Sequence, residues 1–340
     1  MIKKRFILTI ILLSLLLLLT ACTGKNNEET QSSPQTDVIR MAVEYNTHAA
    51  PVFVAQETGE LSAEGAFDAY ATGVALSGAL TQGRIDAAYI CLIPAINAYA
   101  NGNVPLKILC GTHKYGYGMV VDTSKIKTLQ DLEKKEVKIG CVREGSTVDI
   151  LLNKIIDLHG LDRQKVLSKV VRMNPAQQVI ALFTGQVEAI LVPEHFASLA
   201  AENGNYEMII KGQDLWPDMQ GSVLVVTEDF YINNPEKSEE LYRITDRACR
   251  FINEHPREAA AIVADKLNVL KDTLEDIDLD QIAKGQDSLS ATSAVIEQSM
   301  QNLDYTTAID SDHIQQVINY VYELGYIKQA FPAEEIIAKR

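Results

Sequence analysis

Short apolar segments of strand type alternate with segments of helical type along most of the chain. The first series of expected strands and helices covers residues 38–45, 51–59, 67–72, 73–83, 85–91, 93–102 and 104–110. The second series covers residues 136–141, 146–160, 165–171, 174–186, 187–193, 194–204, 206–210 and 222–227. Parallel strands must be joined by crossover segments, usually helices, which then cover both faces of the sheet. The alternation therefore predicts an α/β fold with mostly parallel sheets flanked by helices.

The chain is too long for a single hydrophobic core. It has 340 residues, of which 47% are hydrophobic and 22% are charged, which is a typical globular composition. Because one core stops growing at about 250–300 residues, we expect two lobes. After residue 234 the pattern is almost purely helical, with helices expected at 235–254, 257–267, 272–284, 294–302 and 311–324.

The N-terminal segment has the pattern of an export signal. A basic start at residues 3–5 precedes an apolar run over residues 6–19, which is shorter than the ~20 residues that a membrane-spanning helix needs. The run ends in Leu-Thr-Ala-Cys at residues 19–22, which resembles the lipobox of bacterial lipoproteins. This resemblance implies a signal peptide, residues 1–21, that is cleaved before Cys22. It also implies that Cys22 carries a lipid, with diacylglycerol on its sulfur and palmitate as an acyl chain.

The polar segment 22–37 cannot bury a core and is expected to be a flexible tether. We therefore expect a protein outside the cytoplasm, held at the cell membrane by its lipid anchor alone. An ordinary secretory signal followed by a chance cysteine is the alternative. The 31 basic and 45 acidic residues give a formal charge of −14. This charge argues against a nucleic-acid partner, because a phosphate-binding surface needs clustered Lys and Arg.

Several spacings resemble those of the solute-binding proteins of ABC transporters of the nitrate, sulfonate and taurine type. Pyrimidine-precursor binding proteins are related to the same group. The segments that carry the resemblance are VFVAQETGELSAEG (52–65), ALTQGRIDAAY (79–89), TLQDLEKKEVKIGCVREGST (128–147) and IALFTGQVEAILVPEHFASLAAENG (180–204).

The resemblance implies a two-lobed, periplasmic-binding-protein-like fold of type II, with a cleft between the lobes. Lobe one is expected at residues 38–118 and 226–340, and lobe two at residues 119–225. The two crossings between lobes are expected near Tyr117–Asp122 and Ser222–Glu228. The resemblance also implies a monomer that captures a small molecule and works with a permease and its ATPase, without a cofactor and without enzymatic activity.

Candidate ligand-binding residues follow the expected strands. In open parallel sheets, ligands bind beyond the carboxyl ends of strands, where helix N-termini offer free N–H groups and a positive dipole end. The candidates are Asn46, His48, Gly73, Cys91, Thr112, His113 and Tyr115 in lobe one, and Ser146, Thr147, Asn174, Glu194 and His195 in lobe two.

The expected ligand is a small organic or inorganic oxyanion, such as a sulfonate or nitrate. The turn at residues 144–147 places two hydroxyls and free N–H groups at the start of a long helix, with Arg143 just before it. A neutral heterocycle such as a thiamine pyrimidine precursor is the alternative. Glu144 and Glu194 would repel an anion if they faced the cleft. Aromatic residues near the crossings, Trp216 among them, would suit a flat ring or form a lid or surface packing.

Other functions find less support in the sequence. There is no Gly-x-Ser-x-Gly, P-loop, His-Glu-x-x-His or Cys-x-x-Cys motif. An enzyme that makes a pyrimidine shares this fold, but it uses clustered cysteines that this chain lacks. An extracytoplasmic sensor is a further alternative. Cys91, Cys110 and Cys141 each end an expected strand, and with His48 and His113 they offer soft-metal ligands, but we favour a packing role and expect no metal.

Overall fold

The computed structural model describes residues 39–61, 67–270 and 289–339. Residues 38–340 form one structural unit, distinct from residues 1–37. The expected signal peptide, the tether and the expected helix at 272–284 therefore lie outside the described residues, wholly or in large part. No helix within the described ranges is both long enough and apolar enough to cross a membrane.

The first sheet has six strands in the order β11-β4-β10-β3-β1-β2. These strands are β1 (Met41–Glu44), β2 (Phe67–Tyr70), β3 (Ala87–Cys91), β4 (Leu106–Tyr115), β10 (Gln220–Thr227) and β11 (Leu303–Asp304). β1 pairs in parallel with β2 and β3, whereas β10 runs antiparallel between β3 and β4. The sheet is therefore mixed, and only its β3-β1-β2 side has the expected parallel pattern.

The second sheet has five strands in the order β7-β6-β8-β5-β9. These strands are β5 (Tyr117–Asp122), β6 (Ile139–Cys141), β7 (Val170–Arg172), β8 (Ala189–Pro193) and β9 (Tyr206–Lys211). β6 runs parallel to β7 and β8, and β5 runs antiparallel to β8 and β9. Parallel strands thus again lie together on one side of a mixed sheet.

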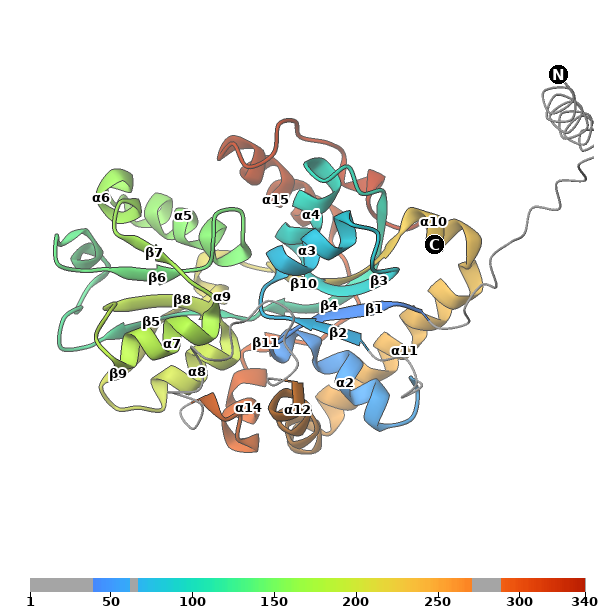
Figure 1. Ribbon diagram of the computed structural model, residues 1–340, viewed down its shortest axis with the longest axis horizontal. Helices are drawn as coiled ribbons and strands as arrows, with labels where there is room; N and C mark the ends of the chain where they lie inside the picture. The colour runs from blue at the N-terminus through green and yellow to red at the C-terminus, as the bar shows by residue number, and fades with distance from the viewer. Residues whose placement is uncertain (1–38, 62–66, 271–288, 340) are drawn as a thin grey trace, which may run out of the picture. The chain divides into compact units, whose positions relative to one another are not determined.

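Helices cover both faces of each sheet (Figure 1). Around the first sheet these are α2 (Ala50–Glu57), α3 (Gly73–Thr81), α4 (Leu92–Ala100), α10 (Glu228–Asn233), α11 (Pro235–Glu254), α12 (Pro256–Leu270), α14 (Ser293–Met300) and α15 (Ser311–Glu323), with short 3-10 turns η1 (Thr47–Ala49) and η5 (Ala333–Glu335). Around the second sheet they are η2 (Leu129–Glu133), α5 (Thr147–His159), α6 (Arg163–Leu167), α7 (Pro175–Phe183), α8 (Glu194–Ala201) and α9 (Gly212–Leu215). Ala42 and Val43, neighbours in β1, belong to separate buried clusters. Successive side chains of a strand point to opposite faces of the sheet, so β1 is packed against helices on both of its faces.

The chain passes between the sheets twice, each time just before the segment near which the sequence pattern predicts a crossing. The first lies at Gly116, between β4 and β5, so the segment 117–122 is already a strand of the second sheet. The second lies between β9 and β10, at residues 212–219, so the segment 222–227 belongs to the first sheet. A continuous apolar run identifies a buried strand, but it does not tell which sheet the strand joins.

The structure also corrects the expected strand at residues 165–171. Residues 165–171 were expected to form one strand, but α6 ends at Leu167 and β7 begins at Val170. The Asp162 side chain accepts a hydrogen bond from the Lys165 N–H, which caps α6 and so favours a helix at this point.

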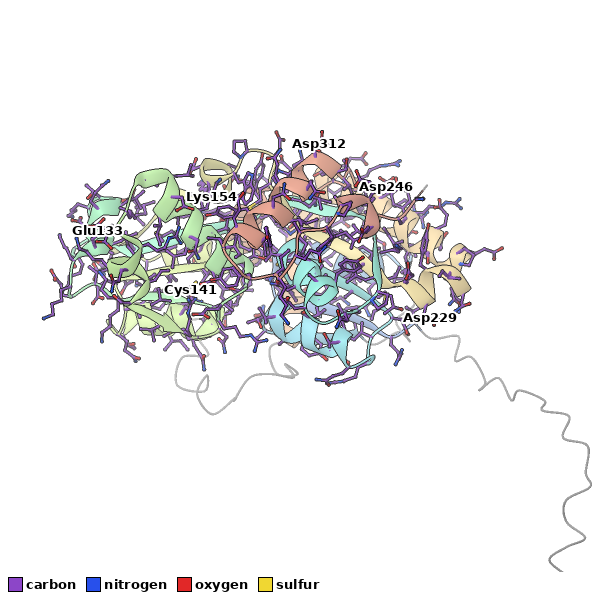
Figure 2. All side chains as sticks on the ribbon, turned by 90° about the horizontal axis from the view of Figure 1, so that it is seen from above. Glu133, Cys141, Lys154, Asp229, Asp246 and Asp312 are labelled. Carbon is purple, nitrogen blue, oxygen red and sulfur yellow. The ribbon has the colours of Figure 1, made fainter. Side chains whose placement is uncertain are left out.

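Trp216, expected as a lid or surface residue on a polar loop, is buried just after α9. Its exposed fraction is only 7%. Its ring lies edge-on to Tyr320 of α15, and the Lys154 ammonium of α5 lies 4.7 Å from the ring centroid. Figure 2 labels Lys154 on α5 and Asp312 on α15, the two helices that meet at this ring. The only tryptophan therefore packs between helices that belong to different sheets.

Replacing Gly116 by Ala should destabilise the protein. Its φ of +92° is one that residues with a side chain rarely adopt, and a Cβ there would lie 2.8 Å from His48 Nε2. We expect Gly116→Ala to lower the free energy of unfolding by more than about 1 kcal/mol, measured by urea denaturation. Gly204→Ala, where a Cβ meets nothing within 4 Å, is the control. Equal stability of the two variants would contradict a strained crossing.

Candidate functional site

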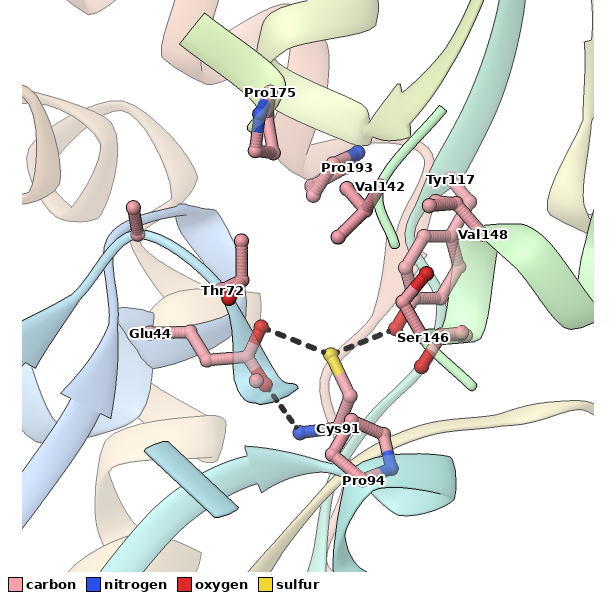
Figure 3. Close-up of a pocket in the computed structure, with 13 residues that line it drawn as sticks. Glu44, Thr72, Cys91, Pro94, Tyr117, Val142, Ser146, Val148, Pro175 and Pro193 are labelled. Atoms are coloured by element: carbon pink, nitrogen blue, oxygen red, sulfur yellow. Dashed lines mark hydrogen bonds between the residues drawn. The ribbon is translucent and has the colours of Figure 1, made fainter. Parts of the chain in front are cut away.

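A small pocket lies where the two sheets face each other (Figure 3). Its lining combines first-sheet and second-sheet residues, namely Glu44, Ala71, Thr72, Gly73, Cys91, Pro94, Tyr117, Val142, Ser146, Thr147, Val148, Pro175 and Pro193. Its volume of about 30 Å³ has room for about two water molecules. Small-molecule sites usually measure about 300–1,000 Å³, so this pocket is much smaller than a typical ligand site.

Five helices begin at the wall of this pocket. Thr72 caps α3 by accepting the Ala75 N–H, and Ser146 caps α5 by accepting the Asp149 N–H. Cys91 precedes α4, Pro193 precedes α8, and α7 begins at Pro175. Helix starts carry unpaired N–H groups and the positive end of the helix dipole. The wall of the pocket therefore favours negatively charged groups or polar acceptors.

The buried carboxylate of Glu44 already lies in this region, which favours negatively charged groups. Glu44 ends β1 and is 3% exposed. Its Oε1 accepts the Cys91 N–H at 2.7 Å, and its Oε2 accepts the Cys91 thiol at 3.1 Å. At Gly73, the first residue of α3, a Cβ would lie 2.3 Å from Glu44 Oε1. Glycine at this position therefore allows the carboxylate to approach the start of α3.

His48 and Tyr117 complete a polar cluster around Cys91. The His48 Nε2 lies 2.7 Å from the Gly116 carbonyl oxygen, which can only accept, so Nε2 carries the proton. The other ring nitrogen, Nδ1, lies 3.6 Å from Cys91 Sγ. The Tyr117 hydroxyl donates to the same sulfur at 2.9 Å. Burial lowers the pKa of His48 to about 4 and raises the pKa of the Cys91 thiol well above its usual value.

Glu194 and His195 follow β8 as expected, but they do not line the pocket. Glu194 is fully buried and accepts hydrogen bonds from Asn302 at 2.8 Å and from Ser198 at 3.0 Å. Burial raises its pKa to about 7. His195 stacks on Phe196 with a centroid distance of 3.9 Å, and burial lowers its pKa to about 3. Glu194 therefore joins α8 to the segment that follows α14.

The structure brings together part of the predicted set. Gly73, Cys91, Ser146 and Thr147 line the pocket. Asn46 and His48 lie directly behind it, against Glu44 and Cys91, and the His113 ring packs on His48 at 4.3 Å. The others lie outside the lining: Thr112 is buried in β4, Tyr115 adjoins the first crossing, and Asn174 caps α7.

Glu44 lines the pocket but was not predicted, whereas Thr72 stands at an expected strand end and Tyr117 is one of the aromatic residues near the expected crossings, and both also line the pocket. Each had a sequence signal. Glu44 is a charged residue at the end of an apolar strand, and Thr72 is a capping residue in front of the expected helix at Gly73. Tyr117 was treated as part of a crossing, whereas it is the first residue of β5.

Arg143 and Glu144 face a different, open groove beside the pocket. There the buried Asp149 accepts a hydrogen bond from the Tyr326 hydroxyl, and Asn97 of α4 donates to the Gly145 carbonyl at 2.8 Å. These bonds connect the two parts of the fold. Arg143 therefore does not supply the pocket with a bidentate partner, and Glu144 does not repel an anion there.

Two mixed sheets flanked by helices, two crossings and a pocket between the sheets define the class of periplasmic-binding-protein folds. Residues 32–268 match the NMT1-like family. The chain belongs to this family, and the expected likeness to solute-binding proteins of the nitrate and sulfonate type is confirmed at the level of the fold. No curated protein matches the chain.

Three solved structures illustrate the shared fold. The alkanesulfonate-binding protein SsuA from Xanthomonas axonopodis, bound to MOPS, has a TM-score of 0.70 and 15% identity, covering 89% of this chain and 98% of its own. The nitrate-binding protein NrtA from Synechocystis has a TM-score of 0.67 and 17% identity, covering 88% and 84%. The ligand-binding component of an ABC-type import system from Staphylococcus aureus, with zinc bound, has a TM-score of 0.68 and 16% identity, covering 88% and 96%. These neighbours are binding proteins or import components and not enzymes.

The buried Glu194 should make stability depend on pH in a defined direction. Its pKa is about 7 in the folded state, against an ordinary value of 4.5, so the folded state binds more protons between these values. Its contribution to stability is therefore fully present below about pH 4.5 and is lost as the pH rises to about 7. Between pH 4.5 and pH 7 we expect the free energy of unfolding of Glu194→Gln, measured by urea denaturation, to rise by up to about 3 kcal/mol relative to that of the wild type.

Buried histidines change the pH profile of both proteins equally, so the difference between variant and wild type isolates Glu194. The exposed Glu202 at the end of α8 provides the control Glu202→Gln. A difference between Glu194→Gln and wild type that stays constant from pH 4.5 to pH 7 would contradict this assignment.

Proposed function

We propose that the chain is the extracytoplasmic solute-binding component of an ABC importer, and that it captures a small oxyanion between its two sheets. Membership of the NMT1-like family supports this function, as does a fold shared with sulfonate-binding and nitrate-binding proteins. The solute would then pass to a membrane permease driven by its ATPase. The sequence pattern of residues 1–22 supports export and a lipid anchor at Cys22, with residues 22–37 as the tether.

The convergence of helix starts on one pocket carries the proposal of an anionic solute. Helices α3 and α4 begin on the first-sheet side, and α5, α7 and α8 begin on the second-sheet side. Oriented N–H groups and dipoles need no reorganisation to receive a negative charge. Ser146 and Thr147 place hydroxyls at the start of α5, on the pocket wall.

Solute capture requires the two sheets to separate. At about 30 Å³ the pocket has no room for a substituted sulfonate. The two crossings, at Gly116 and at residues 212–219, are the connections at which a hinge rotation would occur. The solute would enter the separated form and become enclosed as the sheets return to the arrangement described here.

Glu44 favours a second candidate, a neutral heterocycle. A carboxylate on the pocket wall repels an anion but accepts hydrogen bonds from ring N–H or amino groups. Tyr117, also on the wall, offers an aromatic face beside it. The two candidates predict opposite effects of Glu44 on solute affinity, because its charge weakens binding of an oxyanion and strengthens binding of a hydrogen-bond donor.

Calorimetry with a panel of sulfonates, nitrate, bicarbonate, pyrimidines and aromatic acids tests the proposal. We expect an oxyanion to bind, and Thr147→Val to weaken that binding about tenfold, since a hydrogen bond to a charged group contributes about 1.5–3 kcal/mol. Thr184→Val makes the same change on an exposed residue of the same part of the fold and should leave affinity unchanged. Glu44→Gln should strengthen binding of an oxyanion. Weaker binding of a heterocycle to Glu44→Gln, with no oxyanion bound, would establish the second candidate instead.

A further inference from the structure

Three potential metal ligands of different kinds meet at the pocket wall. A carboxylate oxygen of Glu44, the Nδ1 of His48 and the thiol sulfur of Cys91 all lie within 4.8 Å of one another. Among the residues that the structure describes, they are the one group of three such side chains close enough to share a metal ion. All three are buried, at 2–3% exposed.

The distances within the group suit tetrahedral coordination. Cys91 Sγ lies 3.1 Å from Glu44 Oε2 and 3.6 Å from His48 Nδ1. With Zn–S near 2.3 Å and Zn–N or Zn–O near 2.0–2.2 Å, adjacent tetrahedral ligands are separated by roughly 3.5 Å. Both distances from the sulfur are therefore close to those of a tetrahedral site, and the carboxylate and imidazole ligand atoms lie within 4.8 Å of each other.

The hydrogen bonds around the cluster hold His48 in the form that binds metal. Its Nε2 proton is held by the Gly116 carbonyl, which leaves the Nδ1 lone pair directed at the sulfur. Metal-binding histidines commonly donate their second ring nitrogen to a carbonyl in this way. Cys91 has a single thiol hydrogen, and both Glu44 Oε2 and His48 Nδ1 face it. Glu44 Oε2 also accepts a hydrogen bond from Asn46 at 3.4 Å, and a cation that takes the place of the thiol hydrogen can bind the carboxylate, the imidazole and the sulfur together.

We propose that Glu44, His48 and Cys91 bind a single divalent ion of zinc type. Thiolate and imidazole ligands favour Zn²⁺ over Ca²⁺ or Mg²⁺, which prefer oxygen ligands alone. On binding, Cys91 releases its proton to solvent, and the charges of the carboxylate and thiolate balance the two charges of the ion. Because Glu44 and Cys91 line the pocket, the fourth coordination position opens into it. Three protein ligands with one open position are the arrangement of metal sites that bind exogenous molecules.

This site changes the sequence-based interpretation of Cys91, which favoured a packing role. Cys110, Cys141 and Cys249 are also buried, but they do not belong to this group. The metal site goes beyond the proposed function and does not depend on it, because a metal ion can bind whether or not a solute does.

Cobalt(II) titration of the full, chelator-treated chain tests the proposal. We expect a thiolate-to-cobalt charge-transfer band in the near ultraviolet that saturates at one equivalent and disappears when Zn²⁺ displaces Co²⁺. Cys91→Ser should abolish the band and weaken Zn²⁺ binding by at least about 100-fold. Glu44→Gln should keep the band and weaken binding. Cys110→Ser, which removes a buried thiol outside the cluster, should behave as the wild type.

No charge-transfer band in the wild type would overturn the proposal, and this outcome needs no variant. A band that survives Cys91→Ser in folded protein, checked by circular dichroism, would also overturn it. A rise in melting temperature with Zn²⁺ but not with Mg²⁺ provides independent support, since a ligand of the folded state raises stability. Solute calorimetry on chelator-treated protein tests the proposed function separately from the metal site. Solute binding without any metal binding would leave the proposed function intact and reject the metal site alone.

Discussion

The buried carboxylate of Glu44 is the interaction on which the pocket depends. Burial of a charge is costly unless polar groups surround it, and here the Cys91 N–H, the Cys91 thiol and the start of α3 do so. This arrangement fixes several features at once. It requires a glycine at residue 73, it holds the end of β1 against the start of α4, and it places Cys91 next to His48. Both the choice of solute and the proposed metal site follow from how this one charge is balanced.

The second constraint is the connection between the two sheets. The crossings are short, and direct bonds supplement them, including Asn97 to Gly145 and Lys211 to Asn302. Trp216 packs between α5 and α15 close to the second crossing. These contacts hold the sheets together around a pocket of about 30 Å³. Residues of both sheets also share the two buried apolar clusters, so separation at the crossings breaks apolar as well as polar contacts between the sheets while it leaves the packing inside each sheet intact.

Strand-end reasoning predicted the part of the site that depends on local sequence. Gly73, Cys91, Ser146 and Thr147 each stand where an apolar strand gives way to a helix, and that local order places them at the pocket. The same reasoning included Glu194, which lies at a strand end but packs towards Asn302. It omitted Glu44, since a single charge at the end of an apolar strand is read as part of the strand. The sequence could not assign the segments 117–122 and 222–227 to a sheet, because β5 and β10 have equally apolar sequences and which sheet each joins depends on long-range pairing.

The proposed function requires that solute binding closes the two sheets around the pocket at Glu44. Small-angle X-ray scattering of the purified protein, with and without a saturating solute found by calorimetry, tests it most directly. We expect a smaller radius of gyration with solute, together with a scattering profile that matches the structure with its small pocket. An unchanged radius of gyration at saturation, with the solute-free protein already matching this arrangement, would contradict it.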